Sequence, residues 1–339
     1  MAKAVKMKDI ADRLHVSTMT VSKALSGKPG VSEVMRDRIR ILAFEMGYVL
    51  PGAQKEEKLC QTIGVILESC YIEGCETFYW KLYQEINTEA ARRNCFVLLE
   101  ILEEEERKEL RIPKMVIENK VDGLLVLGET DSVYLEMLLL SAKIPMVYLD
   151  FYNDQVREDS VISNSFYGAY HVTNYLFERG HRQIAFVGTL SGTKSIMDRF
   201  LGYEKSMLEH GERIRQDWVI PDRDGERAVY EIIVLPEKMP TAFVCSCDLT
   251  ASRLIRELKR NGYRIPEDIS VVGYDDYLYP GLCDVGLTSY GVDKKGMACA
   301  GIDILLSKIQ GKVYARGMRI VDGYLAERES VASIESDLI

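Results

Sequence analysis

Carboxylate side chains follow several short apolar runs of this sequence. Glu68, Asp150 and Asp275 each stand just after the end of such a run, and Asp248 follows another. Arg199 adds a forked hydrogen-bond donor, which we expect near the same rim. Such a set can perform acid–base chemistry, or it can bind the vicinal hydroxyl groups of a sugar through matched hydrogen bonds.

The sequence favours binding over catalysis. It contains no G-x-S-x-G, no G-x-x-x-x-G-K-[ST], no G-x-G-x-x-G and no H-E-x-x-H motif. The four histidines lie far apart, and neither Cys70/Cys75 nor Cys245/Cys247 belongs to a second pair at metal-ligand spacing. We therefore expect a protein that is not an enzyme, with no cofactor and no metal ion.

The composition is that of a soluble globular protein with more than one domain. Of the 339 residues, 47% are hydrophobic and 28% are charged. No stretch approaches the roughly 18 consecutive apolar residues of a membrane span, and the charged N-terminus does not look like a secretion signal. We expect a cytoplasmic protein with reduced thiols and no membrane contact.

The charge is divided unevenly along the chain. Residues 1–55 hold ten Lys and Arg against five Asp and Glu, a net charge of +5, so the total of −9 leaves −14 on the remainder. A basic head on an acidic body indicates that only the head approaches a polyanion.

From Thr62 onward, short apolar runs alternate with longer amphipathic stretches. This alternation predicts parallel sheets covered by helices on both faces, and the length favours two such units. The expected strands are Ile63–Leu67, Phe96–Ile101, Gly123–Leu127, Met146–Leu149, Ile184–Gly188, Ala242–Cys245 and Ile269–Gly273. The expected helices include Tyr79–Arg93, Tyr170–Arg179, Ser195–His210, Leu249–Asn261 and Lys294–Gln310.

The first 48 residues predict three short helices. One apolar stripe covers Met7 to Leu14, and a second begins after Ser17, which we expect to be the N-cap of that helix. A third helix follows Ser32, its expected N-cap. The outward residues of the second helix can enter a DNA major groove. An ordinary helical bundle with an arbitrary surface is the alternative on spacing alone.

The order of residues in this head indicates a particular protein family, which the helix spacing alone does not. The run MKDIADRLHVSTMTVSKALSGKPGVSEVMRDRIRILAFEMGYVLP resembles the DNA-binding head of the lactose-repressor/galactose-repressor family. The resemblance implies double-stranded operator DNA as partner, with Thr18, Met19 and Lys23 at base-reading positions. It places the phosphate contacts at Ser17, Thr20, Ser22, Ser26 and Ser32, and Tyr48 of the later Gly-Tyr pair is a further expected DNA contact.

The linker at residues 49–62 departs from the family pattern. The family usually has a hinge helix here, whose Leu wedges into the minor groove, whereas this chain reads VLPGAQKEEKLCQTIGV and is shorter. Glu56 and Glu57 would lie unfavourably against phosphates. A flexible tether without groove contact is the simpler expectation.

The body resembles the same family over nearly its whole length, in segments such as VDGLLVLG, GAYHVTNYLFERGHRQIAFVG and IPEDISVVGYDD. Family ligand positions then fall on Asp150, Arg199 and Asp275. Cys247 stands where the family often has a ligand-binding Asn, and Arg223 stands near a family aromatic. Glu68 is a further candidate at a strand end, and the candidates for replacement stacking or for plain packing are Tyr79 and Trp80.

The resemblance implies a body of two lobes and a homodimer. We expect a head at 1–48, a first lobe at 63–161 and 291–320, and a second lobe at 162–290 and 321–339. The dimer would form mainly between first lobes, with Tyr83, Leu98 or Met115 at the interface or simply on the helix surface.

The expected function is a DNA-binding transcriptional regulator, switched by a small ligand such as a sugar bound between the lobes. The other reading is a ligand sensor whose head no longer reads DNA well, because Met19 is neutral and the hinge is altered.

Overall fold

The computed structural model describes residues 6–25, 28–46, 60–72, 78–224, 229–277 and 283–334. The chain forms two compact units, which divide between Cys60 and Gln61. Ser26, Tyr48 and residues 49–59 of the expected hinge lie outside the described residues.

The head consists of three helices, α1 (Met7–Leu14), α2 (Thr18–Leu25) and α3 (Glu33–Glu45). Both expected N-caps are confirmed. The Thr20 backbone N–H donates to Ser17 Oγ at 3.1 Å, and the Met35 N–H donates to Ser32 Oγ at 3.4 Å. The small core of the head contains Ile10, Ala11, Val21, Ala24, Ile39 and Ala43.

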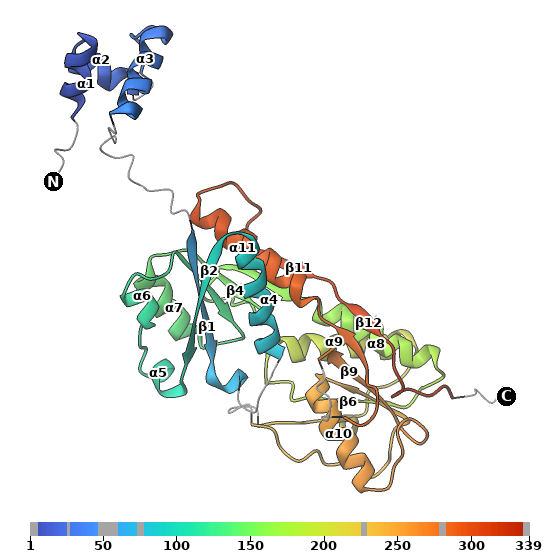
Figure 1. Ribbon diagram of the computed structural model, residues 1–339. Helices are drawn as coiled ribbons and strands as arrows, with labels where there is room; N and C mark the ends of the chain where they lie inside the picture. Colours follow the sequence, from blue (N-terminus) through green and yellow to red (C-terminus); the bar gives the residue numbers. More distant parts are fainter. Residues whose placement is uncertain are drawn as a thin grey trace. The chain divides into compact units, whose positions relative to one another are not determined.

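The body contains two six-stranded sheets (Figure 1). The first has the order β11-β5-β4-β3-β1-β2 and is parallel throughout. Its strands are β1 (Gln61–Glu68), β2 (Cys95–Leu102), β3 (Gly123–Leu127), β4 (Met146–Leu149), β5 (Asp159–Ser163) and β11 (Met318–Val321). The part of the body built on this sheet is called the first lobe.

The second sheet has the order β12-β10-β9-β8-β6-β7 and is parallel except at its β12 edge. Its strands are β6 (Ile184–Val187), β7 (Val219–Ile220), β8 (Ala242–Cys245), β9 (Ser270–Asp275), β10 (Thr288–Gly291) and β12 (Tyr324–Ala326). The part built on this sheet is the second lobe.

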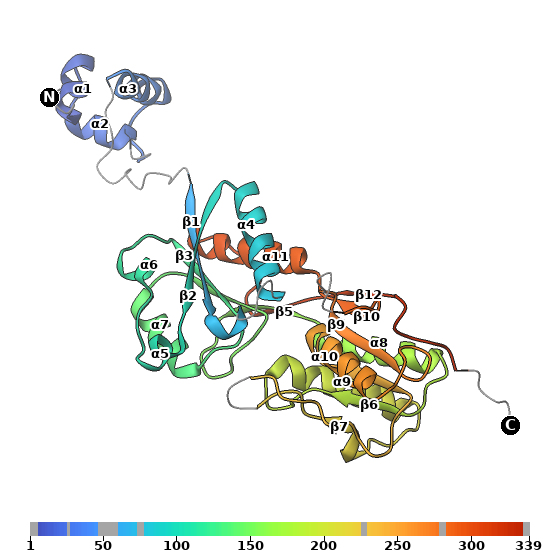
Figure 2. The same ribbon diagram turned by 60° about the horizontal axis from the view of Figure 1, so that its bottom comes forward.

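Helices cover both faces of each sheet, which is why the central strands are apolar without alternation. The first-lobe helices are α4 (Phe78–Arg92), α5 (Glu104–Lys108), α6 (Lys114–Ile117), α7 (Ser132–Ala142) and α11 (Lys294–Ile309), with a 3₁₀ turn at Ser69–Tyr71. The second-lobe helices are α8 (Ser165–Glu178), α9 (Lys194–Glu209) and α10 (Asp248–Arg260), with a 3₁₀ turn at Gln216–Trp218. Although α4 and α11 are far apart in the sequence, they lie side by side in both views (Figures 1 and 2).

The chain changes sheet after β5, after β10 and after β11. These passages lie close to the lobe crossings expected near Val161, Tyr290 and Val321, and we propose the lobe boundaries on this basis. Among the described helices, none has both the length and the apolar character needed to cross a bilayer.

One interface residue expected from the family lies in the interior. Met115 is only 5% exposed, because it packs with Leu124 and Val121 in the core of the first lobe. The interface assignment of Met115 is therefore corrected to a core position. Leu98 is 40% exposed on the edge strand β2, and Tyr83 is half-buried on α4.

A glycine allows the closest helix contact of the second lobe. A Cβ atom at Gly202 of α9 would lie 2.0 Å from the carbonyl oxygen of Phe166 in α8. The two helices therefore meet backbone to backbone, side by side in Figure 2.

We expect Gly202→Ala to lower the free energy of unfolding by about 1–3 kcal/mol, because the added methyl must push α8 away from α9. Chemical denaturation measures the change. Leu201→Ala, at a 41% exposed neighbouring position, is the control and should change stability much less. Equal stability of Gly202→Ala and the wild type would contradict this packing.

Candidate functional site

A cavity of about 210 Å³ lies between the two lobes, and we call it the interlobe cavity. Its walls come from the β1–α4 connection and the end of β4 in the first lobe, and from α9, α10 and the end of β9 in the second. Six of the sequence-predicted ligand residues line it: Tyr79, Asp150, Arg199, Arg223, Cys247 and Asp275.

Three buried charges form the centre of this cavity. Arg199 Nη2 lies 3.4 Å from Asp275 Oδ1, and Arg199 Nη1 donates to the Ser246 carbonyl at 2.5 Å. The guanidinium carbon also lies 3.8 Å from the centroid of the Tyr274 ring. Asp150, at the end of β4, accepts a hydrogen bond from the Tyr79 hydroxyl on Oδ2 at 3.0 Å.

Two polar atoms of the cavity remain unpaired within the described part of the chain. Asp150 Oδ1 and Arg199 Nε are buried without a hydrogen-bond partner, and the two residues are only 8% and 6% exposed. A buried acceptor and a buried donor without partners are costly. One ligand hydroxyl can donate to the first or accept from the second, so a polyhydroxylated ligand would satisfy both.

The two aspartates of the cavity, Asp150 and Asp275, both have a positive backbone φ angle. Asp150 has a φ of +68° and Asp275 has a φ of +106°. Such conformations are strained for residues other than glycine, although Asp and Asn tolerate them best, and they cluster at functional sites.

Burial dominates the electrostatics of the cavity. It raises the pKa of Asp150 to about 6, with Arg199 opposing the rise and Asp275 adding to it. Burial likewise raises the pKa of Asp275, which Arg199 opposes. Asp150 therefore stays ionised at neutral pH, but at a cost in folding free energy.

The second-lobe wall of the cavity departs from the family pattern. Arg223 is held by Asp222, at 3.0 and 2.8 Å, and lies over the Tyr230 ring with 4.3 Å from Cζ to the centroid. Cys247 serves as the N-cap of α10, where its Sγ accepts from the Thr250 N–H at 3.4 Å. The Tyr230 hydroxyl lies 3.6 Å from the same sulfur.

Two predicted ligand residues do not line the cavity. The Glu68 carboxylate forms an ion pair with Arg107, with 3.2 Å between Oε2 and Nε. Trp80 packs against Tyr83 with 5.4 Å between ring centroids. Glu68 was a candidate because it directly follows an expected strand, and Trp80 because it is an aromatic residue at the start of an expected helix. Sequence reasoning missed the aromatic lining residues Tyr71, Phe78, Tyr230 and Tyr277, because they lie in connections or at a helix start, where no periodicity marks a side chain as inward.

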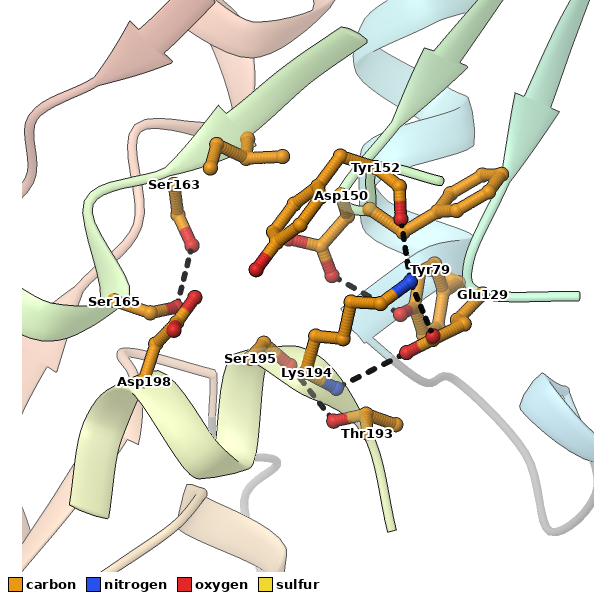
Figure 3. A pocket seen from close by; sticks show the side chains of 12 residues that line it. Tyr79, Glu129, Asp150, Tyr152, Ser163, Ser165, Thr193, Lys194, Ser195 and Asp198 are labelled. Atoms are coloured by element: carbon orange, nitrogen blue, oxygen red, sulfur yellow. Dashed lines mark hydrogen bonds and ion pairs between the residues drawn. The ribbon is translucent and has the colours of Figure 1, made fainter. Parts of the chain in front are cut away.

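A smaller chamber adjoins the interlobe cavity and shares Tyr79, Asp150, Thr193 and Ser195 with it. We call it the side chamber, and Figure 3 shows the residues that line it. Its volume is about 20 Å³, enough for one water-sized group. The remaining wall consists of Glu129, Phe151, Tyr152, Ile162, Ser163, Ser165, Lys194 and Asp198.

In the head, the predicted DNA residues surround the start of α2. Thr18, Met19 and Ser22 are exposed, with 67% of Met19 accessible, and Lys23 is half-buried. The Ser17 hydroxyl caps α2 and lies 2.9 Å from the Thr20 hydroxyl. Thr20 is half-buried, and Ser32 is exposed.

Comparison with known proteins matches both units. Residues 6–50 match the model of bacterial regulatory proteins of the lacI family, and residues 173–331 match the periplasmic binding protein-like domain. The HTH-type transcriptional repressor PurR of Aliivibrio fischeri is 27% identical over 96% of this chain and 98% of its own length. The HTH-type transcriptional repressor CytR of Escherichia coli is 28% identical over 98% of this chain and 97% of its own.

Solved structures share the fold over nearly the whole chain. The complex of the transcriptional regulator CelR with cellobiose has a TM-score of 0.67 at 23% identity, covering 96% of this chain and 99% of that one. The lac repressor dimer bound to operator has a TM-score of 0.64 at 23% identity, covering 97% and 100%. The chain therefore combines a lacI-family DNA-binding head with a periplasmic-binding-protein-like body.

Proposed function

We propose that this protein is a cytoplasmic, homodimeric repressor of a carbohydrate-utilisation operon, which a small sugar-like ligand switches. The head would read operator DNA, and the interlobe cavity would hold the ligand. The observation that carries the ligand assignment is the pair of unpaired buried atoms, Asp150 Oδ1 and Arg199 Nε, in one cavity. The PurR and CytR relatives, both named as repressors, support the DNA-binding role.

The proposed switch uses the separation of the binding groups between two sheets. Asp150 belongs to the first lobe, and Arg199 and Asp275 belong to the second. A ligand that contacts all three has a different affinity for the closed and the open arrangement of the lobes, which is the condition for an allosteric effect. The paired first lobes of a dimer would carry this change to the spacing of the two heads.

Selection of DNA sites from a random pool with the purified full-length protein tests the regulator. A thermal-shift screen of mono- and disaccharides then finds the ligand. Enrichment of a two-fold symmetric sequence is expected, because a dimer places its two heads on equivalent half-sites.

We expect Lys23→Ala to weaken binding to the selected site about tenfold or more and to reduce the slope of log K against log salt by about 1. Fluorescence anisotropy at several salt concentrations measures both. Lys312→Ala removes the same charge from an exposed position of the acidic body and should leave both quantities unchanged. A wild-type protein without preference for any duplex over random competitor would instead favour the ligand sensor that does not read DNA.

We expect Asp275→Asn to weaken binding of the sugar found in the screen by at least about tenfold, because a charged acceptor is lost. Asparagine tolerates the left-handed backbone at this position, so the local conformation is retained. Calorimetry measures the affinity. Asp284→Asn, at a side chain that is 74% exposed and pairs with Lys259, is the matched control. Unchanged affinity of Asp275→Asn would exclude this cavity as the site.

We expect Asp150→Asn to stabilise the free protein while it weakens ligand binding. The folded-state pKa of about 6 lies above the ordinary 3.8, so the folded state favours the protonated acid. The cost of ionisation is absent below the ordinary pKa of 3.8, grows as the pH rises from 3.8 to about 6, and stays on the order of 3 kcal/mol above that. Denaturation at pH 4.5 and pH 7.5 should show a clearly larger advantage of the variant at the higher pH. An advantage of equal size at both values would contradict this origin.

A further inference from the structure

The side chamber carries an excess of negative charge. Its wall contains three carboxylates, Glu129, Asp150 and Asp198, and one cationic side chain, Lys194. Lys194 is engaged with Glu129: its Nζ lies 3.1 Å from Oε1, and its backbone N–H donates to Oε2 at 3.0 Å. The same ammonium donates to the Tyr152 carbonyl at 2.8 Å. Lys194 and Glu129 thus neutralise each other across the two lobes.

The other two carboxylates have no such partner. Within the described residues, neither Asp150 nor Asp198 forms an ion pair at 4.0 Å or less. Asp150 is 8% exposed, and its Oδ1 has no hydrogen-bond partner at all. Figure 3 shows Asp150 and Asp198 on opposite sides of the space, with the Tyr152 ring between them in this view.

The remaining polar groups of the chamber are neutral. Ser163 Oγ and Ser165 Oγ lie 3.3 Å apart, and the Thr193 and Ser195 hydroxyls lie 2.9 Å apart. These hydroxyls can accept or donate, but they cannot balance two carboxylates. Burial raises the pKa of Asp198, with Arg199 opposing this, although Arg199 itself is committed to Asp275 and the Ser246 carbonyl.

An ammonium group matches this space in size, charge and hydrogen bonding. A volume of about 20 Å³ admits one group the size of a water molecule. A protonated amine has three donors and no acceptor, which suits a wall of carboxylates and hydroxyls. A water molecule would supply hydrogen bonds, but it would leave the buried Asp150 and the half-buried Asp198 without an added counter-charge.

We propose that the effector is an amino sugar or a similar amino polyol, whose protonated amine occupies the side chamber between Asp150 and Asp198. This proposal rests on the proposed sugar-binding function, and it adds the chemical class of the ligand. The two spaces share Asp150, Tyr79 and Ser195 in their walls. The hydroxylated ring then lies in the interlobe cavity against Arg199 and Asp275, while its amine reaches the chamber.

Calorimetry with the full-length protein at pH 7 tests the ligand class. The probes are three matched pairs: glucosamine and glucose, galactosamine and galactose, mannosamine and mannose. We expect at least one hexosamine to bind about tenfold or more tightly than its parent hexose, because a charge-assisted hydrogen bond to a buried carboxylate is lost in the hexose. The N-acetylated form of that hexosamine, which is uncharged, should lose the advantage in the wild-type protein.

Asp198→Asn tests the location of the amine. We expect it to reduce the preference for the hexosamine over the hexose to about threefold or less, because one of the two carboxylates is lost. Glu204→Gln is the control, since Glu204 lies on the same helix but lines neither space, and the preference should persist. Should Asp198→Asn fail to fold, the comparison with the N-acetylated sugar in the wild type still decides whether a charged amine is recognised.

Three outcomes overturn the proposal. A hexose that binds as tightly as its hexosamine removes the ammonium site but leaves the proposed sugar regulator intact. A preference that survives Asp198→Asn places the amine elsewhere. No binding of any sugar or amino sugar overturns the proposed effector class, and the ammonium site with it.

Discussion

The buried contact between Arg199 and Asp275 is the interaction around which the interlobe cavity is organised. Two charges removed from water are tolerated only when they pair and make further polar contacts. For Arg199 these are a hydrogen bond to the Ser246 carbonyl and a cation–π contact with the Tyr274 ring. Asp150 approaches this pair from the other lobe with one oxygen unpaired. Since the three groups belong to two sheets, a ligand that completes their hydrogen bonds also selects one arrangement of the lobes.

The second-lobe wall explains why similarity to the lacI family does not name the ligand. An amide in place of Cys247 could both donate to and accept from a hydroxyl, whereas the thiol is a weak donor and acceptor whose sulfur already caps α10. Arg223 is held by Asp222 and stacked on Tyr230, so its position is fixed before any ligand arrives. We therefore infer that the groups on the Asp150 side of the cavity distinguish between ligands more than Arg223 and Cys247 do.

The sequence predicted most of the elements that surround the site. The helix at Met7–Leu14 and both serine N-caps are confirmed, because amphipathic period and capping are local properties. The seven expected strands are confirmed with small differences at their ends, since each is a short run of mainly apolar residues.

The elements that were missed lack those local signals. In β5 (Asp159–Ser163) polar residues are buried by distant partners, and Asp159 accepts from Tyr314 and from the Gly317 N–H, which no local pattern reveals. In α7 (Ser132–Ala142) apolar residues occupy nearly every position, so no polar stripe marks a helix. The placement of Tyr230 and the side chamber likewise depends on how two lobes meet.

The uneven charge of the chain links its two proposed binding activities. Residues 1–55 carry +5 of a total of −9, so the remainder carries −14. A negative body is repelled by DNA phosphates, which leaves the head to make the contact. The same negative surroundings lower the free energy of a cation in the side chamber and raise that of an anion, because buried charges are poorly screened. A phosphorylated sugar would therefore be repelled by Asp150 and Asp198, whereas a protonated amine would reduce the repulsion between these two carboxylates. On this proposal, the negative charge that disfavours contact between the body and DNA also favours cationic over anionic ligands.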